Sequence, residues 1–137
     1  SALESMAAAL AAKRRPSDAE LAPLEQASRD MAKALKADDL EAWAEADERF
    51  HRHLIELSGN RLLVEAVLNF WDRAHRARMV TLRMRPRPTH STREHRAVLK
   101  AIRAGDAAKA RDLHRAHRER GAVELTEILK QFRLSSL

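Results

Sequence analysis

Residues 47–63 read DERFHRHLIELSGNRLL, and this stretch holds the end of one helix and the start of the next. Phe50 and Leu54 are four residues apart, a spacing that places both side chains on one face of a helix. Gly59 is expected to end that helix, because glycine readily adopts the left-handed conformation that follows a helix C-terminus. Asn60 is a favourable N-cap for a second helix. The stretch therefore predicts two consecutive amphipathic helices joined by a tight connection.

The same signals divide the rest of the chain into helices. Two Ser-x-x-Glu pairs, Ser17 with Glu20 and Ser91 with Glu94, have the pattern of a capping box at a helix start. No β-branched stretch alternates with the two-residue period of a strand. The expected helices span residues 3–13, 17 to about 36, 38 or 39 to 58, 60 to about 83, 91 to about 105, and 106 to about 132. Short connections between helices of this length predict an all-α antiparallel bundle.

Composition limits the classes of protein to consider. The 137 residues suit one domain, and 45% of them are hydrophobic, enough for a folded core. The chain has no cysteine, which excludes disulfides and cysteine zinc sites and fits a cytoplasmic protein. No apolar run is long enough to span a membrane, and no signal peptide is expected. The net charge of +6 comes from abundant arginine offset by 20 acidic residues.

Several polar residues fall on the predicted apolar faces. Asp47 and His51 are four residues apart on the third helix, in line with its apolar stripe. His95 lies on the stripe of the fifth helix, and His117 lies on that of the sixth, which also includes Phe132. An unpartnered buried polar group costs about 1–3 kcal/mol or more. One shared divalent metal would satisfy all four, and this ligand set suits zinc, nickel, iron or manganese.

Other roles for these histidines stay open on the residues alone. Acid–base pairs four residues apart are common in helices, and an inward histidine is usually a hydrogen-bonded core residue. His114 is the alternative ligand from the sixth helix. We expect most of the remaining histidines to be solvated: His53, His75, His90 and His114.

In combination, these motifs resemble the C-terminal effector-binding domain of GntR-family transcription regulators of the FadR type. The series comprises Asp-x-x-Phe-His at 47–51, Ser-Gly-Asn at 58–60, Glu-His at 94–95, AIRAGDAAKA at 101–110, and His117. The resemblance covers nearly the whole chain and implies an antiparallel bundle of six or seven helices in one domain, residues 1–137. It also implies that Asp47, His51, His95 and His117 hold a divalent metal, with zinc expected first.

The resemblance extends to partners. Family members usually form homodimers through this domain, so we expect a homodimer. They bind operator DNA through an N-terminal winged helix-turn-helix domain, which is absent from this chain. The expected function is that of a ligand-sensing domain of a bacterial transcription regulator.

The expected effector is a small carboxylate. Such a metal site keeps a net positive charge and open coordination positions, which suit an organic acid. The apolar stripe of the fourth helix includes Phe70 and Ala74 and continues four residues later at Arg78. Arg78 is therefore one candidate to clamp the carboxylate, and Arg73 is the second. Both positions are also favoured by the resemblance. The alternative for either is a solvated surface arginine.

Two other classes of function compete. A metal-dependent hydrolase could use an open metal position to activate water, but the chain has no His-Glu-x-x-His motif and no evident general base. A basic helical module could bind nucleic acid through RAHRARMVTLRMRPRP at 73–88. That stretch lacks interleaved Phe or Tyr for stacking on bases. We therefore expect no enzyme activity.

Overall fold

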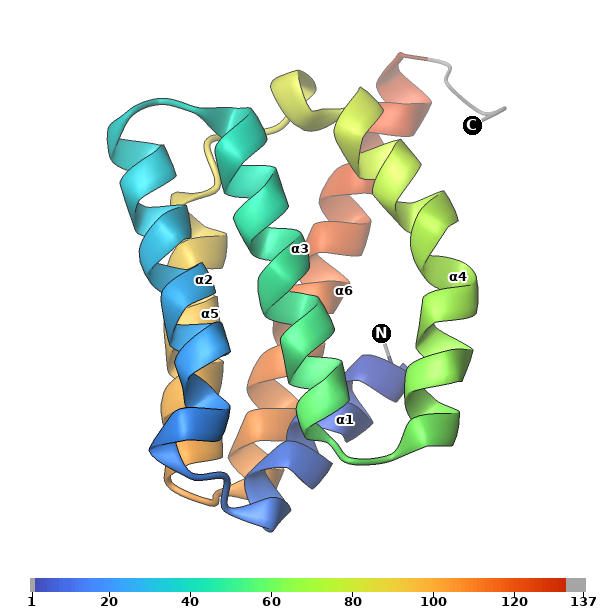
Figure 1. Ribbon diagram of the computed structural model, residues 1–137. Coiled ribbons are helices and arrows are strands. Elements are labelled where there is room, and N and C mark those ends of the chain that lie inside the picture. The colour runs from blue at the N-terminus through green and yellow to red at the C-terminus, as the bar shows by residue number, and fades with distance from the viewer. Residues whose placement is uncertain (1, 133–137) are drawn as a thin grey trace.

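The computed structural model describes residues 2–132, and within them the side chains of residues 72–74 are not described. The described part contains six α-helices and one short 3-10 helix: α1 Ala2–Arg14, α2 Asp18–Lys36, α3 Leu40–Leu57, α4 Arg61–Val80, η1 Leu82–Met84, α5 Thr89–Arg103 and α6 Ala107–Gln131 (Figure 1). This part of the chain has no strand. The all-α bundle expected from the sequence is confirmed.

Polar caps fix most helix starts. The Ser17–Glu20 capping box is present at α2, with both reciprocal hydrogen bonds made. Side chains of Asp39, Asn60 and Asp106 each accept a hydrogen bond from a backbone N–H in the first turn of α3, α4 and α6. These contacts satisfy amides that have no partner within the helix. Gly59 has a φ of +68°, as its predicted position after a helix requires.

The start of α5 differs from the prediction. The helix begins at Thr89 after Pro88, with no side-chain cap, so the Ser91–Glu94 capping box was wrong. Ser91 already lies inside the helix, and its hydroxyl accepts a hydrogen bond from Arg120 on α6. The fourth helix also ends earlier than expected, at Val80, and η1 follows it.

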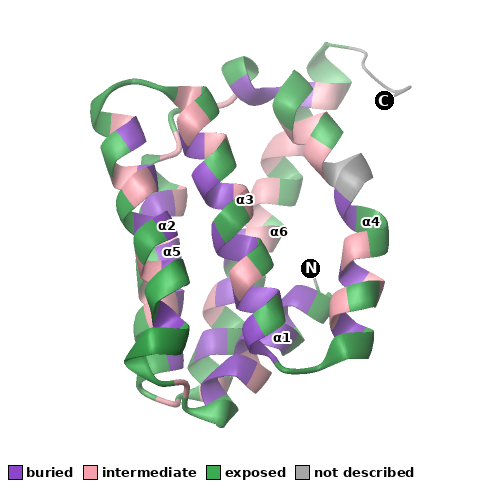
Figure 2. Ribbon diagram, viewed as in Figure 1, coloured by how far each residue is buried: buried purple, intermediate pink, exposed green. Residues whose placement is uncertain are grey.

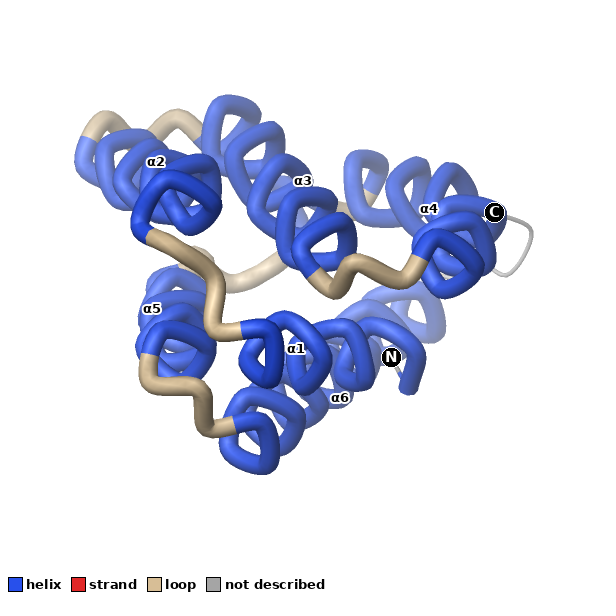
Figure 3. The backbone as a smooth tube through the Cα atoms, turned by 60° about the horizontal axis from the view of Figure 1, so that its bottom comes forward, coloured by secondary structure: helices blue, strands red, loops and turns tan. Residues whose placement is uncertain are grey.

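The helices form two layers. Figure 3 shows α2, α3 and α4 side by side in one layer, with α5, α6 and α1 in the other. Buried residues line the facing sides of the helices in Figure 2. Phe50 and Leu54 of α3 are fully buried in the core between the layers, as are Val98 and Ile102 of α5. The histidine faces of α3, α5 and α6 meet within this core.

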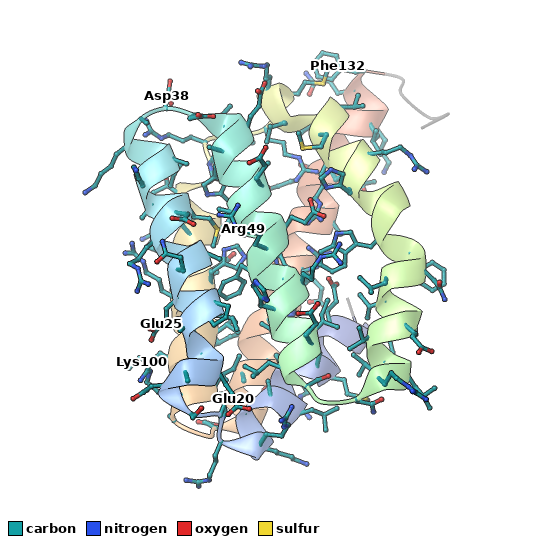
Figure 4. The ribbon with its side chains drawn as sticks, in the orientation of Figure 1. Glu20, Glu25, Asp38, Arg49, Lys100 and Phe132 are labelled. Atoms are coloured by element: carbon teal, nitrogen blue, oxygen red, sulfur yellow. The ribbon has the colours of Figure 1, made fainter. Side chains whose placement is uncertain are left out.

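Two aromatic residues do not lie where the sequence placed them. Phe70 is 70% exposed, and Trp71 occupies the core-facing position of α4 with 5% exposure. Trp71 continues the four-residue spacing of Leu63 and Val67, so the core face of α4 is rotated from the predicted stripe. Phe132 is also exposed and lies beyond the last turn of α6, at the outer end of the bundle (Figure 4).

No described helix is long and apolar enough to cross a membrane.

Candidate metal and ligand site

The polar residues singled out on three helices come together in the core. His51 and His95 are fully buried, and Asp47 and His117 are nearly so. The Nε2 atom of His51 lies 3.2 Å from Nε2 of His95 and 3.3 Å from Nε2 of His117. One ligand atom from each of the three histidines lies within 4.8 Å of the others. The meeting of α3, α5 and α6 expected from the sequence is therefore present.

Asp47 lies at the edge of this group of three histidines, beside two of them. Its Oδ1 lies 3.4 Å from Nε2 of His95 and 3.7 Å from Nε2 of His51. Asp47 precedes His51 by one helical turn of α3, which is why its side chain reaches the same point as the imidazoles. Three ring nitrogens thus lie close together, and one carboxylate oxygen lies next to two of them.

The spacing of these atoms fits a transition-metal ion. Imidazole nitrogens bind zinc at about 2.0–2.1 Å, so two nitrogens on one ion lie roughly 2.9–3.4 Å apart at octahedral to tetrahedral angles. The separations of 3.2 and 3.3 Å from His51 fall within this interval. Nitrogen and carboxylate donors in this ratio match zinc, nickel, iron or manganese better than calcium.

Burial keeps these rings in the state that a metal requires. Burial lowers the pKa values of His51 and His95 well below the usual imidazole value, and neighbouring positive groups lower them further. Both rings are therefore neutral at physiological pH, with a lone pair on one nitrogen. Neutral imidazole is the metal-binding form of histidine.

Glu94 orients His117 from outside the group. Its Oε2 accepts a hydrogen bond of 2.7 Å from Nδ1 of His117, and Arg120 donates two further bonds to the same carboxylate. Burial would raise the pKa of Glu94, but the hydrogen bonds from His117 and Arg120 outweigh it and hold the pKa well below its usual range. The ionised carboxylate can only accept, so Nδ1 of His117 donates in this contact. Nε2 is then the ring nitrogen that faces His51.

His114 was expected to be solvated, and this was wrong. The ring is fully buried, and its Nε2 lies 3.3 Å from Nδ1 of His51. His114 therefore lies behind His51, on the side away from the other two Nε2 atoms. Its spacing of four residues after Ala110, which is also buried, was the signal that could have placed it inward.

The remaining histidines lie at or near the surface. The side chains of His53 and His75 are each 36% exposed and contact Glu56 and Glu48, respectively. His90 is 64% exposed. None of these three rings lies among the converging nitrogens.

Arg78, the first effector candidate, lies beside the group. Its Nη1 is 3.5 Å from Oδ2 of Asp47, and its guanidinium lies 5.9 Å from the centre of the Trp71 ring. Burial lowers the pKa of Arg78, whereas the Asp47 carboxylate raises it. The interpretation of Arg78 as a solvated surface residue does not hold, because its side chain is only 20% exposed. The side chain of Arg73, the second candidate, lies outside the described residues.

A cavity of about 280 Å³ opens onto this group. Asp47, Arg78 and His117 are part of its wall, together with residues of η1, the following loop and α6. A small molecule in the cavity could therefore contact the converging ligand atoms and Arg78 at once. The wall contains more basic than acidic side chains, which favours an anion.

The basic stretch 73–88 is not a continuous exposed surface. Arg78 and Arg85 line the cavity. Arg83 pairs with Glu41, and Arg87 bonds to a carbonyl at the end of α2. Two basic groups of this stretch therefore face the cavity, and two more bind other parts of the chain.

Comparison with known proteins gives a family and a fold. The family model described as FCD domain matches residues 1–120. No curated protein matches the chain. Among solved structures, E. coli McbR/YncC aligns with a TM-score of 0.80 at 20% sequence identity, over 91% of this chain and 63% of that chain. The described bundle is thus similar to a domain-sized part of that longer protein.

Proposed function

This chain belongs to the FCD domain family of GntR-type transcription regulators, and on that premise we propose that it senses a small organic acid at a divalent metal in its core. An FCD domain is a regulatory, ligand-sensing domain rather than an enzyme. The proposed ligands are Asp47, His51, His95 and His117, with zinc as the expected metal. The observation that supports this most is the convergence of three imidazole nitrogens from three helices, with an Asp47 carboxylate oxygen beside two of them.

The proposed ion and the protein groups around it make different contacts with a bound acid. When bound, the metal would supply a positive charge and open coordination positions for a carboxylate oxygen. Arg78 and Asp47 both line the cavity, and the Arg78 guanidinium can donate hydrogen bonds to the acid that binds the metal. The side chain of Arg78 is only 20% exposed and lies over the Trp71 ring, so solvent screens its attraction for an anion less than at the surface.

Regulation follows from where these groups lie. Arg78 is on α4, whereas the proposed metal ligands are on α3, α5 and α6. An acid bound between them links α4 to the rest of the bundle and favours the helix arrangement in which all contacts are made. A ligand shifts such an equilibrium only by its difference in affinity for the two arrangements. We propose that a homodimer carries this change to DNA-binding domains in the cytoplasm.

Thermal unfolding in the presence of carboxylic acids tests the proposal. The protein is unfolded alone, with a chelator, and with a panel of small acids before and after chelation. We expect chelation to lower the melting temperature, because it leaves a carboxylate and three imidazoles in the core without their ion. We expect at least one acid to raise the melting temperature of the metal-loaded protein only.

A matched pair of variants makes the result specific. His117→Gln removes a proposed ligand, whereas His53→Gln changes a half-exposed histidine of α3 that points away from the group. The effect of the chelator should disappear in the first variant and persist in the second. An unchanged melting temperature on chelation of the metal-loaded wild-type protein would contradict the proposal.

A further inference from the structure

The cavity contains a second positive group that the proposed metal site does not use. Arg85 lies just after η1 and lines the cavity. Its Nε donates a hydrogen bond of 3.2 Å to Oγ1 of Thr81, a residue that is itself fully buried. Its Nη2 is buried and has no hydrogen-bond partner among the described residues. A guanidinium nitrogen in that position normally finds an acceptor.

The other arginines on the cavity wall differ from Arg85 in having a carboxylate partner. These pairs are Arg78 with Asp47, Arg87 with Asp38, Arg118 with Glu4, and Arg120 with Glu94. No ion pair joins Arg85 to any acidic side chain that the structure describes. Arg85 is held at one end by Thr81, and its Nη2 has no acceptor among the described residues, so the guanidinium keeps donor capacity for a ligand.

We propose that the effector is a compact dicarboxylate and that Arg85 binds its second carboxylate. This inference rests on the proposed function, in which the first carboxylate binds beside the metal and Arg78. Arg85 and Asp47 line the same cavity from different segments, the loop after η1 and α3. A ligand with two acidic ends can therefore reach both.

The charges around the cavity support two acidic groups rather than one. A divalent ion held by Asp47 and neutral histidines keeps one positive charge, and Arg78 and Arg85 add to it. Burial and the charge on Arg78 lower the pKa of Arg85, whereas the carboxylates of Glu124 and Asp47 raise it. Glu124, which also lines the cavity, already binds Arg120. A monocarboxylate leaves part of this charge uncompensated, whereas a dicarboxylate places an anion at each end.

The volume limits the length of the ligand. The cavity measures about 280 Å³, just below the roughly 300–1,000 Å³ of clefts that enclose drug-sized ligands. A short-chain dicarboxylate fits this space, whereas a coenzyme thioester or a long acyl chain does not.

Calorimetric titration of the metal-loaded protein tests the assignment. Acetate, propionate and butyrate are compared with malonate, succinate and glutarate. In the wild-type protein we expect the best dicarboxylate to bind at least about tenfold more tightly than any of the monocarboxylates, because a charge-assisted bidentate contact is added. Arg85→Gln should remove this advantage, so that the best dicarboxylate binds no more than about twofold more tightly than the best monocarboxylate.

Arg83→Gln is the matched control. Arg83 is two residues earlier, its side chain is 77% exposed, and it pairs with Glu41 outside the cavity. The preference for dicarboxylates should be unchanged in this variant. Comparison of the two variants separates loss of one contact from a general change in charge.

The outcomes distinguish this inference from the function on which it rests. If monocarboxylates bind as tightly as dicarboxylates to the wild-type protein, Arg85 has no role in effector binding, although the metal-bound acid site stands. The same conclusion follows if Arg85→Gln and Arg83→Gln behave alike. If no acid of either class binds the metal-loaded protein, the proposed function fails together with this inference. If Arg85→Gln does not fold, the comparison of mono- and dicarboxylate affinities in the wild-type protein tests the inference.

Discussion

Replacing Glu94 by glutamine should weaken metal binding without removing any proposed ligand. Glu94 accepts hydrogen bonds of 2.7 Å from His117 and of 2.9 and 2.6 Å from Arg120. Glutamine has one acceptor oxygen instead of two, and its amide N–H groups would face donors. The ring of His117 would then lose either its orientation or the negative charge that makes its Nε2 a stronger ligand.

The size of the effect follows from the geometry. Changes to groups that orient metal ligands typically reduce affinity 10–100-fold, or about 1.4–2.8 kcal/mol. The side chain of Glu94 is 24% exposed, and solvent screens part of the contact. We therefore expect a loss of about tenfold, near the lower end of that range.

Competition with a chromophoric chelator measures this loss. Glu124→Gln is the control, because Glu124 also accepts a hydrogen bond from Arg120 but has no contact with His117 in the described structure. Its metal affinity should stay within about twofold of wild type. Equal affinities for Glu94→Gln and the wild-type protein would refute the orienting role, and equal losses in both variants would attribute the effect to Arg120.

Three further predictions concern Asp47 and the buried histidines of the proposed metal site. His114→Leu removes the partner of His51 Nδ1 and should weaken metal binding by up to about tenfold. His90→Leu, at the surface, should leave metal binding unchanged. Competition with the chromophoric chelator measures both affinities. Asp47→Asn removes the only carboxylate among the proposed ligands and should lower metal affinity by at least about tenfold in the same titration. Burial lowers the pKa values of His51, His95 and His114, so these rings stay neutral in the folded protein while unfolded chains bind protons below about pH 6.5. The metal-free protein should thus be most stable above that pH. As the pH falls below it, the free energy of unfolding should drop by up to about 1.4 kcal/mol per pH unit for each such histidine. Urea unfolding at several pH values measures this, and a free energy of unfolding that stays constant between pH 7 and 5 would contradict it.

Short-range sequence signals were sufficient to predict most of the helix boundaries. The capping box at Ser17, the N-cap at Asn60 and the glycine at residue 59 all act as the sequence predicted. Each depends on neighbours within a few residues. The Ser91–Glu94 pair had the same pattern, but Glu94 bonds instead to His117 and Arg120 on α6. A tertiary ion-pair network of this kind competes with a local cap, and no pattern within α5 reveals it.

Helical periodicity was less reliable for predicting which of two neighbouring residues on a helix face is buried. Phe70 and Trp71 both fall near the apolar stripe of α4, and only packing determines that Trp71 is buried. His114 and His117 likewise lie on one face of α6, and both are buried. Arg85 lies outside any regular helix, so helical spacing gave no indication that it lines the cavity.

Elemental analysis of the purified protein addresses the central proposal most directly. The wild-type chain, prepared without chelators and then dialysed, should retain about one divalent transition-metal ion per chain, and His117→Gln should retain far less under the same conditions. A wild-type protein that holds no such ion even after incubation with zinc, or a His117→Gln variant that holds as much as wild type, would contradict it.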